Sequence, residues 1–138
     1  MPKKVASRNS LTRQEKRDLD IEIGFLEGLV DRDPSYLDAL QLLGDNYTKR
    51  GKYGAGLRID QRLAALRPRD PLVFYNLACS LCLSKQFDEA VAALERAIDL
   101  GYRDFRWLAG DPDLRDLRKQ PVYRRIRVKL RQMRVRVR

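Results

Sequence analysis

The chain repeats its own pattern after 34 residues, and this period constrains the fold more than any other feature of the sequence. Aligning residues 37–70 with residues 71–104 gives five identities: Leu43 with Leu77, Arg62 with Arg96, Leu66 with Leu100, Arg69 with Arg103 and Asp70 with Asp104. Positions that differ still match in size, as Leu40 does with Phe74, Gly44 with Ala78, and Gly56 with Ala90. A repeat of this length is typical of helical hairpins that stack and share one continuous core.

Each copy predicts two helices joined by a short turn. In the first copy, Leu40, Leu43 and Tyr47 recur at helical spacing, which predicts helices over residues 36–49 and 53–66 with a break at Gly51. The second copy predicts a helix from residue 71 to a turn at residues 85–86, and then a helix over residues 87–100.

Capping signals mark where these helices begin and end. Thr12 and Glu15 form a capping box, which predicts a further helix over residues 12–31, and Ser35 with Asp38 resembles a second box. Asp70–Pro71 combines an N-cap with a proline in the first turn, and Gly101 predicts a left-handed C-cap.

The pattern Leu40-x-x-Leu43-Gly44-x-x-Tyr47, continued by Tyr53, Gly56 and Pro68, resembles the tetratricopeptide repeat. The second copy, from Asn76 through Phe87 and Ala90 to Ile98, is closer to that family, and the resemblance covers about residues 20–104. It implies an all-α fold, an antiparallel helix-pair solenoid of about two full repeats, with an N-terminal helix, C-terminal capping helices and one concave face. The first copy departs from the family at Asp60, which stands where Leu94 stands in the second copy, and at Gly56, which replaces an alanine.

Residues 100–123 resemble the closing segment of many bacterial tetratricopeptide proteins. A third copy begins with Phe105 and Leu108 but fails at Asp111, as expected of a terminal repeat that caps the core. We expect Trp107 and Tyr123 to pack within this cap.

The composition excludes several kinds of catalytic site. The sequence has no histidine, which removes Ser-His-Asp and Cys-His catalysis and histidine-ligated metals. No phosphate-binding glycine loop is present. Cys79 and Cys82 are predicted to lie in mid-helix as two small apolar side chains, without the helix N-terminus that a redox pair needs or the further ligands that zinc needs. We therefore expect no enzyme activity, no cofactor and no metal.

The resemblance also implies where a partner would bind. With Leu77, Ala78 and Leu81 on the buried face, Tyr75, Cys79 and Cys82 would face the concave groove, opposite the equivalent residues of the first copy. The predicted partner-binding residues are Gln41, Asp45, Thr48, Lys49, Tyr75, Asn76, Cys79, Cys82 and Arg106. Gln41 and Asp45 replace the lysine and asparagine with which some family members clamp an acidic C-terminus, so we do not expect that clamp. The alternative is a groove filled by the chain's own N-terminal helix.

Positive charge is concentrated at the two ends of the chain. The net charge is +5 over residues 1–17, −5 over residues 18–117 and +10 over residues 118–138. The last segment predicts a basic helix to about Gln132, with Ile126, Leu130 and Met133 on one stripe. Its cations include Arg124, Arg125, Arg127, Lys129, Arg131 and Arg134. Three interpretations are open: the segment extends the stack and neutralises the acidic body, binds nucleic-acid phosphates, or lies on an acidic membrane surface.

These observations predict a basic flexible segment over residues 1–11, a helical repeat domain over residues 12–117 and a basic tail over residues 118–138. The expected function is that of a cytoplasmic, non-catalytic adaptor or scaffold that binds a protein or peptide in its groove and has no membrane span. The alternative is a nucleic-acid- or ribosome-associated protein held by its basic ends. Self-association through exposed repeat edges is a third prediction.

Overall fold

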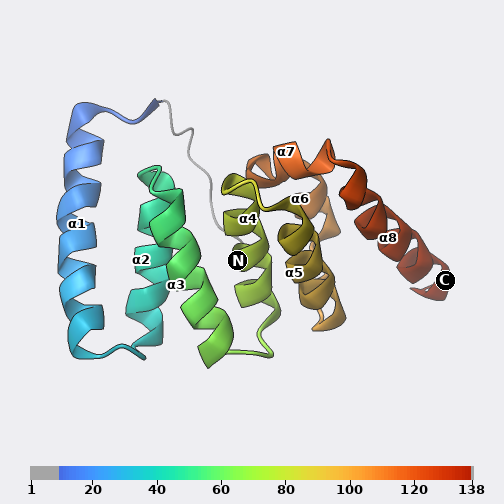
Figure 1. Ribbon diagram of the computed structural model, residues 1–138, viewed down its shortest axis with the longest axis horizontal. Coiled ribbons are helices and arrows are strands. Elements are labelled where there is room, and N and C mark those ends of the chain that lie inside the picture. Colours follow the sequence, from blue (N-terminus) through green and yellow to red (C-terminus); the bar gives the residue numbers. More distant parts are fainter. Residues whose placement is uncertain (1–9, 138) are drawn as a thin grey trace.

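The computed structural model describes residues 10–137, and the regular structure in that range is entirely helical (Figure 1). Most of the segment predicted as a basic N-terminus lies outside the described residues. The helices are α1 (Arg13–Arg32), α2 (Leu37–Lys49), α3 (Tyr53–Leu66), α4 (Pro71–Leu83), α5 (Phe87–Asp99), α6 (Phe105–Gly110), α7 (Arg115–Arg118) and α8 (Arg124–Val137), with 3₁₀ turns η2 (Pro112–Leu114) and η3 (Pro121–Tyr123). None of the helices in the described part is long and apolar enough to span a membrane.

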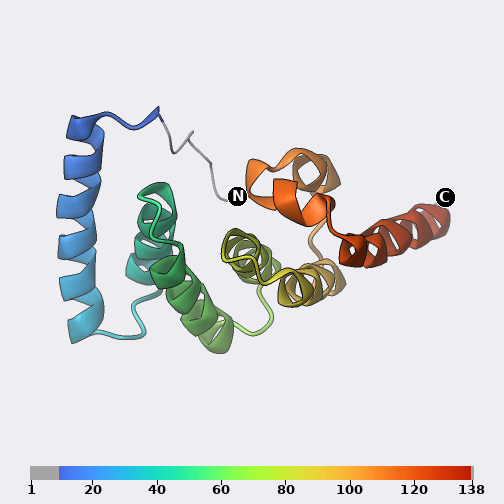
Figure 2. The ribbon, with the colours of Figure 1, turned by 45° about the horizontal axis from the view of Figure 1, so that its top comes forward.

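Helices α1 to α5 stand side by side in chain order, each packed against the next (Figure 1). The short α6 and α7 do not continue this row. The segment that contains them folds back on α4, with the turn η2 between them in contact with α4. Helix α8 then runs outward beside α5 at the far end (Figure 2).

The two copies have equivalent geometry at an offset of 34 residues. Helices α2 and α4 begin 34 residues apart, as do α3 and α5. Arg62 donates to the carbonyl of Pro34 at 2.8 Å, and Arg96 donates to the carbonyl of Pro68 at 3.1 Å. The turns also match, because Gly51 and Lys85 both have positive φ, at 85° and 60°.

Three of the four predicted caps are confirmed. Thr12 and Glu15 form a complete capping box, Asp70 accepts from the backbone N–H of Leu72, and Gly101 ends α5 with a φ of 118°. The predicted box at Ser35 is wrong. Residue 36 is the N-cap of α2, without a side-chain hydrogen bond, because the Ser35 hydroxyl is bonded to Asp33 instead.

The departures of the first copy from the repeat pattern are accommodated by close packing. A Cβ atom on Gly44 would lie 3.2 Å from Ile59 Cγ2, and one on Gly56 would lie 3.2 Å from Thr48 Oγ1, so glycine lets α2 and α3 approach closely. Asp60 is buried and accepts a hydrogen bond from the Ser80 hydroxyl of α4. A polar link between α3 and α4 therefore replaces the apolar contact expected at this position.

The C-terminal segment is part of the same domain. Ile126 is fully buried in the core cluster that contains Leu114 and Leu117, so the predicted boundary at residue 118 is not a structural one. Helix α8 extends to Val137, past the predicted end at Gln132. Tyr123 is buried and Trp107 packs against the same core, which confirms that these aromatic side chains pack within the cap.

Candidate functional site

The α4 face that was predicted to line an open groove is covered by the chain itself. Tyr75 and Cys79 are 0% exposed and Cys82 is 2% exposed. All three lie in one core cluster with residues of the C-terminal cap (residues 100–123), among them Tyr102 and Leu117. The prediction that these three side chains face a partner is therefore wrong. The alternative filling by the N-terminal helix is wrong as well, since the covering segment is the C-terminal cap.

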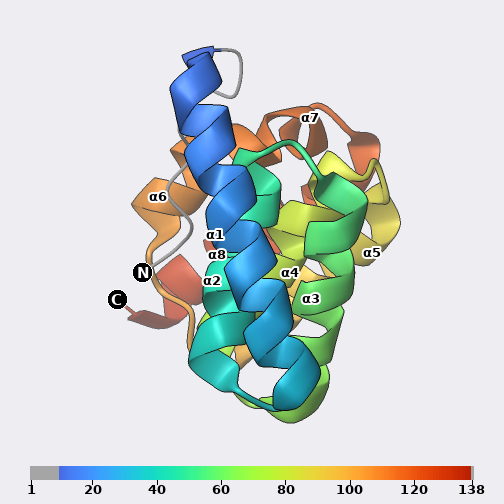
Figure 3. The ribbon, with the colours of Figure 1, turned by 90° about the vertical axis from the view of Figure 1, so that its left-hand side faces the viewer.

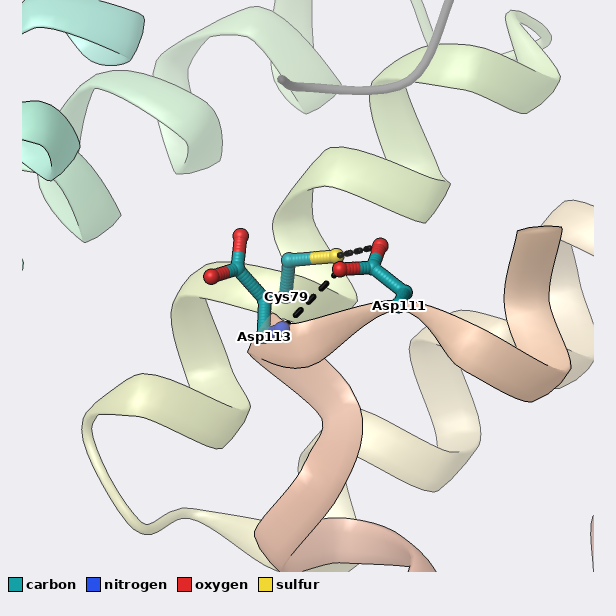
Figure 4. A group of neighbouring side chains, drawn as sticks. All are labelled: Cys79, Asp111 and Asp113. Carbon is teal, nitrogen blue, oxygen red and sulfur yellow. Dashed lines mark hydrogen bonds between the residues drawn. The ribbon is translucent and has the colours of Figure 1, made fainter. Parts of the chain in front are cut away.

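Asp111 links the C-terminal cap to α4 by side-chain hydrogen bonds (Figure 4). Its carboxylate accepts hydrogen bonds from the Tyr75 hydroxyl at 2.7 Å, the Cys79 thiol at 3.6 Å and the backbone N–H of Asp113 at 2.9 Å. The Tyr75 ring also stacks on Tyr102, with 4.3 Å between ring centroids. Burial, followed by the nearby Cys79 and Asp111, raises the pKa of Tyr75 far above its ordinary value, so its hydroxyl keeps the proton that it donates.

Cys79, Asp111 and Asp113 also form a cluster of potential metal ligands, with one ligand atom of each lying within 4.8 Å of the others (Figure 4). Structural zinc sites use four protein ligands, and this cluster offers three. The Asp111 oxygens already accept hydrogen bonds from α4 and from the start of η2. This arrangement fits a buried N-cap that ties two segments together.

The two cysteines are expected to be inert while the cap is closed. Burial raises the pKa of the Cys82 thiol from 9.0 to about 11, which reduces the reactive thiolate roughly 100-fold, and burial also restricts access of reagents. Dithionitrobenzoate should therefore label both thiols at least about 100-fold more slowly in the native protein than in guanidinium chloride. Rapid native labelling would show instead that the cap opens and exposes α4.

The remaining predicted groove residues divide into exposed and buried groups. Gln41 and Arg106 are exposed, and Asp45 and Lys49 are half-buried. Thr48 is buried, with its hydroxyl donating to the carbonyl of Gly44. Asn76 is 7% exposed, and its buried side-chain oxygen has no hydrogen-bond partner within the described part of the chain. Among the predicted groove residues, Gln41, Asp45 and Lys49 of α2 and Arg106 thus present side chains to solvent.

A different groove lies between α5 and α8. It has a volume of about 780 Å³ and is lined by Glu95, Pro121, Val122, Arg124, Arg125, Val128, Lys129 and Gln132. Its position was not predicted from the sequence. The available signal was Val128, an aliphatic residue that lies off the stripe formed by the buried Ile126 and the partly buried Leu130.

Ion pairs hold α8 in place along this groove. Arg125 pairs with Glu95, and Lys129 pairs with Asp99 at 2.7 Å. The side-chain hydrogen bond to Glu95 raises the pKa of Arg125. These two cations therefore neutralise acidic residues of the body, while the extension of a repeat stack by the basic segment stays a prediction.

Four further arginines share one side of α8 by their helical spacing. Arg124, Arg127, Arg131 and Arg134 recur at helical spacing and are exposed. Arg127 donates to the carbonyl of Arg118, and its guanidinium lies 4.9 Å from the centre of the Tyr123 ring. No acidic residue follows Asp116 in the sequence, so this side of the helix is strongly positive.

No known protein-family profile matches the chain. The chain is similar to a plant protein from Arabidopsis thaliana that is described as chloroplastic, with 34% identity over 79 residues. The matched segment is 55% of this chain and 24% of the plant protein, so the chain spans about a quarter of the length of that curated relative. The chloroplast location belongs to the plant protein.

Proposed function

We propose that this protein is a non-catalytic protein-interaction module built as a tetratricopeptide-like helix-pair solenoid. The solenoid is supported by the 34-residue offset of the helix starts and by the equivalent bonds of Arg62 and Arg96. A role without catalysis is supported by a sequence that has no histidine and no phosphate-binding loop. Helical repeat stacks present long side surfaces that suit protein recognition.

The observation that carries the proposal is the groove between α5 and α8. Val122 and Val128 give it an apolar floor, and Arg124 stands at its edge. The sequence has no acidic residue after Asp116. Arg125 and Lys129 lie along the side where α8 pairs with α5. The charges of Arg125 and Lys129 are offset by Glu95 and Asp99, which leaves Arg124 to attract a negative group. An apolar floor with this arginine at its edge fits an acidic peptide segment that carries an aliphatic anchor residue.

The test is a display selection of random peptides of about 16 residues against the full-length protein, followed by affinity measurements on the enriched peptides. We expect acidic peptides with aliphatic anchors, and we expect Val128→Asp and Arg124→Glu each to weaken their binding at least about 10-fold. Both substitutions are at partly or fully exposed positions, so the fold should be retained. Arg58→Glu, an exposed charge reversal on α3, is the matched control.

One outcome of this test would reject the α5–α8 groove as the binding site, and another would reject peptide binding altogether. If Asp45→Arg abolishes binding while Val128→Asp does not, the partner occupies the α2 side of the predicted groove and the assignment to α5–α8 is wrong. If no peptide is enriched, the protein-binding proposal fails.

The second candidate function is binding of nucleic-acid phosphates, favoured by the exposed arginines of α8. Four arginines on one side of the helix would each contact a backbone phosphate, and affinity for single-stranded RNA would then fall with salt with a log–log slope of about 0.7 per contact. Anisotropy titrations of labelled RNA, with Arg131→Glu and Arg134→Glu as variants, measure this slope. Removing residues 118–138 would not be a clean test, because Ile126 belongs to the core.

A further inference from the structure

The outer face of α1 carries the two most exposed large apolar side chains of the described chain. Ile21 is 68% exposed and Phe25 is 67% exposed, while the opposite face of the same helix buries Ile23, Leu26 and Val30 against the body. The helix stands at the end of the row, and nothing in the described part of the chain covers its outer face when the row is viewed end-on (Figure 3). Because Ile21 and Phe25 lie one turn apart, they form one contiguous apolar patch, which is the kind of feature that marks interaction surfaces.

Two glycines lie on the same side of α1, and the fold does not require either of them. A Cβ atom added to Gly24 or to Gly28 would meet no atom within 4 Å, so neither glycine makes room for a neighbour in the monomer. Glycine is among the poorest helix formers, and two of them in mid-helix weaken α1. The absence of side chains at these two positions would allow a helix of another molecule to approach α1 closely.

The charges beside this face are arranged in a self-complementary way. At about 100° per residue, Arg17 and Asp31 lie on one flank of the face, and Asp18 lies toward the other flank near Arg32. All four side chains are exposed. When a second copy of the helix is laid antiparallel, Arg17 stands opposite Asp31 and Asp18 stands opposite Arg32.

We infer that α1 is the interface of a homodimer in which two copies pack these faces antiparallel about a two-fold axis. This arrangement sets Ile21 of each copy over Gly28 of the other and brings the two Phe25 rings together at the axis. Parallel pairing would instead place Gly28 on Gly28 and leave a gap, so the sequence fits the antiparallel arrangement better. This inference is independent of the proposed peptide groove, which lies at the other end of the row.

Sedimentation equilibrium of the full chain tests the inference. The monomer mass is 16.1 kDa, and we expect a species of twice that mass at concentrations of tens of micromolar and above. Phe25→Glu should raise the dimer dissociation constant at least about 10-fold. Leu66→Glu, which changes an exposed apolar residue on α3, is the matched control and should leave dimerisation unchanged.

Two further variants test the geometry. Gly24→Ala should raise the melting temperature of the monomer, because alanine favours the helix, and should weaken the dimer, because the added methyl group stands between the helices. Asp18→Arg should weaken the dimer by setting two cations opposite each other, and the double variant Asp18→Arg/Arg32→Asp should restore it. A wild-type chain that stays monomeric up to about 500 µM, or a Phe25→Glu variant that dimerises as wild type does, overturns the inference.

Discussion

Replacing Asp111 by alanine is expected to lower the free energy of unfolding by about 3 kcal/mol. The substitution removes a fully buried carboxylate and leaves the Tyr75 hydroxyl and the backbone N–H of Asp113 without their acceptor. An unsatisfied buried donor costs roughly 1–3 kcal/mol, and a lost N-cap costs about another 1 kcal/mol. For a domain of this size, the melting temperature should fall by about 10 °C.

Asp104→Ala is the matched control for this prediction. Asp104 is also an N-cap, and it accepts from the backbone N–H of Trp107 at 3.2 Å, but it is exposed. Its replacement should cost no more than about 1 kcal/mol. Urea unfolding monitored by circular dichroism measures both variants. If Asp111→Ala loses as little stability as Asp104→Ala, Asp111 does not hold the cap on α4.

The second large effect is expected from Gly44→Leu. A Cβ atom at this position would lie 3.2 Å from Ile59 Cγ2 and 3.2 Å from Asp60 Oδ1, so a leucine side chain must push α2 and α3 apart. Overpacking of this kind should cost about 3 kcal/mol. It would also disturb the bond from Ser80 to Asp60, which joins α3 to α4.

Gly54→Leu tests whether this loss comes from packing. Gly54 lies in the first turn of α3, where the nearest atom to an added Cβ is Arg58 Nη1 at 3.8 Å, at the end of a flexible side chain. The control should therefore change the free energy of unfolding by less than about 1 kcal/mol. Equal losses in the two variants would contradict the close approach of α2 and α3.

The helices and most of their ends could be predicted from the sequence because they depend on local signals. The apolar spacing of Leu40, Leu43 and Tyr47 and the caps at Thr12 and Asp70 act within a turn or two of the chain. The expected helices over residues 12–31 and 53–66 differ from α1 and α3 by at most one residue at each end. The predicted capping box at Ser35 does not form because the Ser35 hydroxyl bonds to Asp33, only two residues away.

The site could not be predicted in the same way because it depends on contacts between distant segments. Cys79 and Asp111 are 32 residues apart, and nothing in the local pattern of α4 shows that its outer face will be covered. An open groove was expected because the C-terminal cap was assumed to continue the row of helices α1 to α5. Instead, the segment from α6 to α7 folds back on α4 (Figure 2). Likewise, the groove between α5 and α8 exists only because Ile126 anchors the basic helix to the core.

The central claim is that a protein partner binds at the groove between α5 and α8. Chemical-shift mapping of the ¹⁵N-labelled full chain, titrated with the tightest selected peptide, tests it most directly. The account predicts that the largest shifts cluster at Val122, Arg124 and Val128, while residues of α2 such as Gln41 and Asp45 change little. Shifts concentrated on α2, or an absence of saturable shifts, would contradict it.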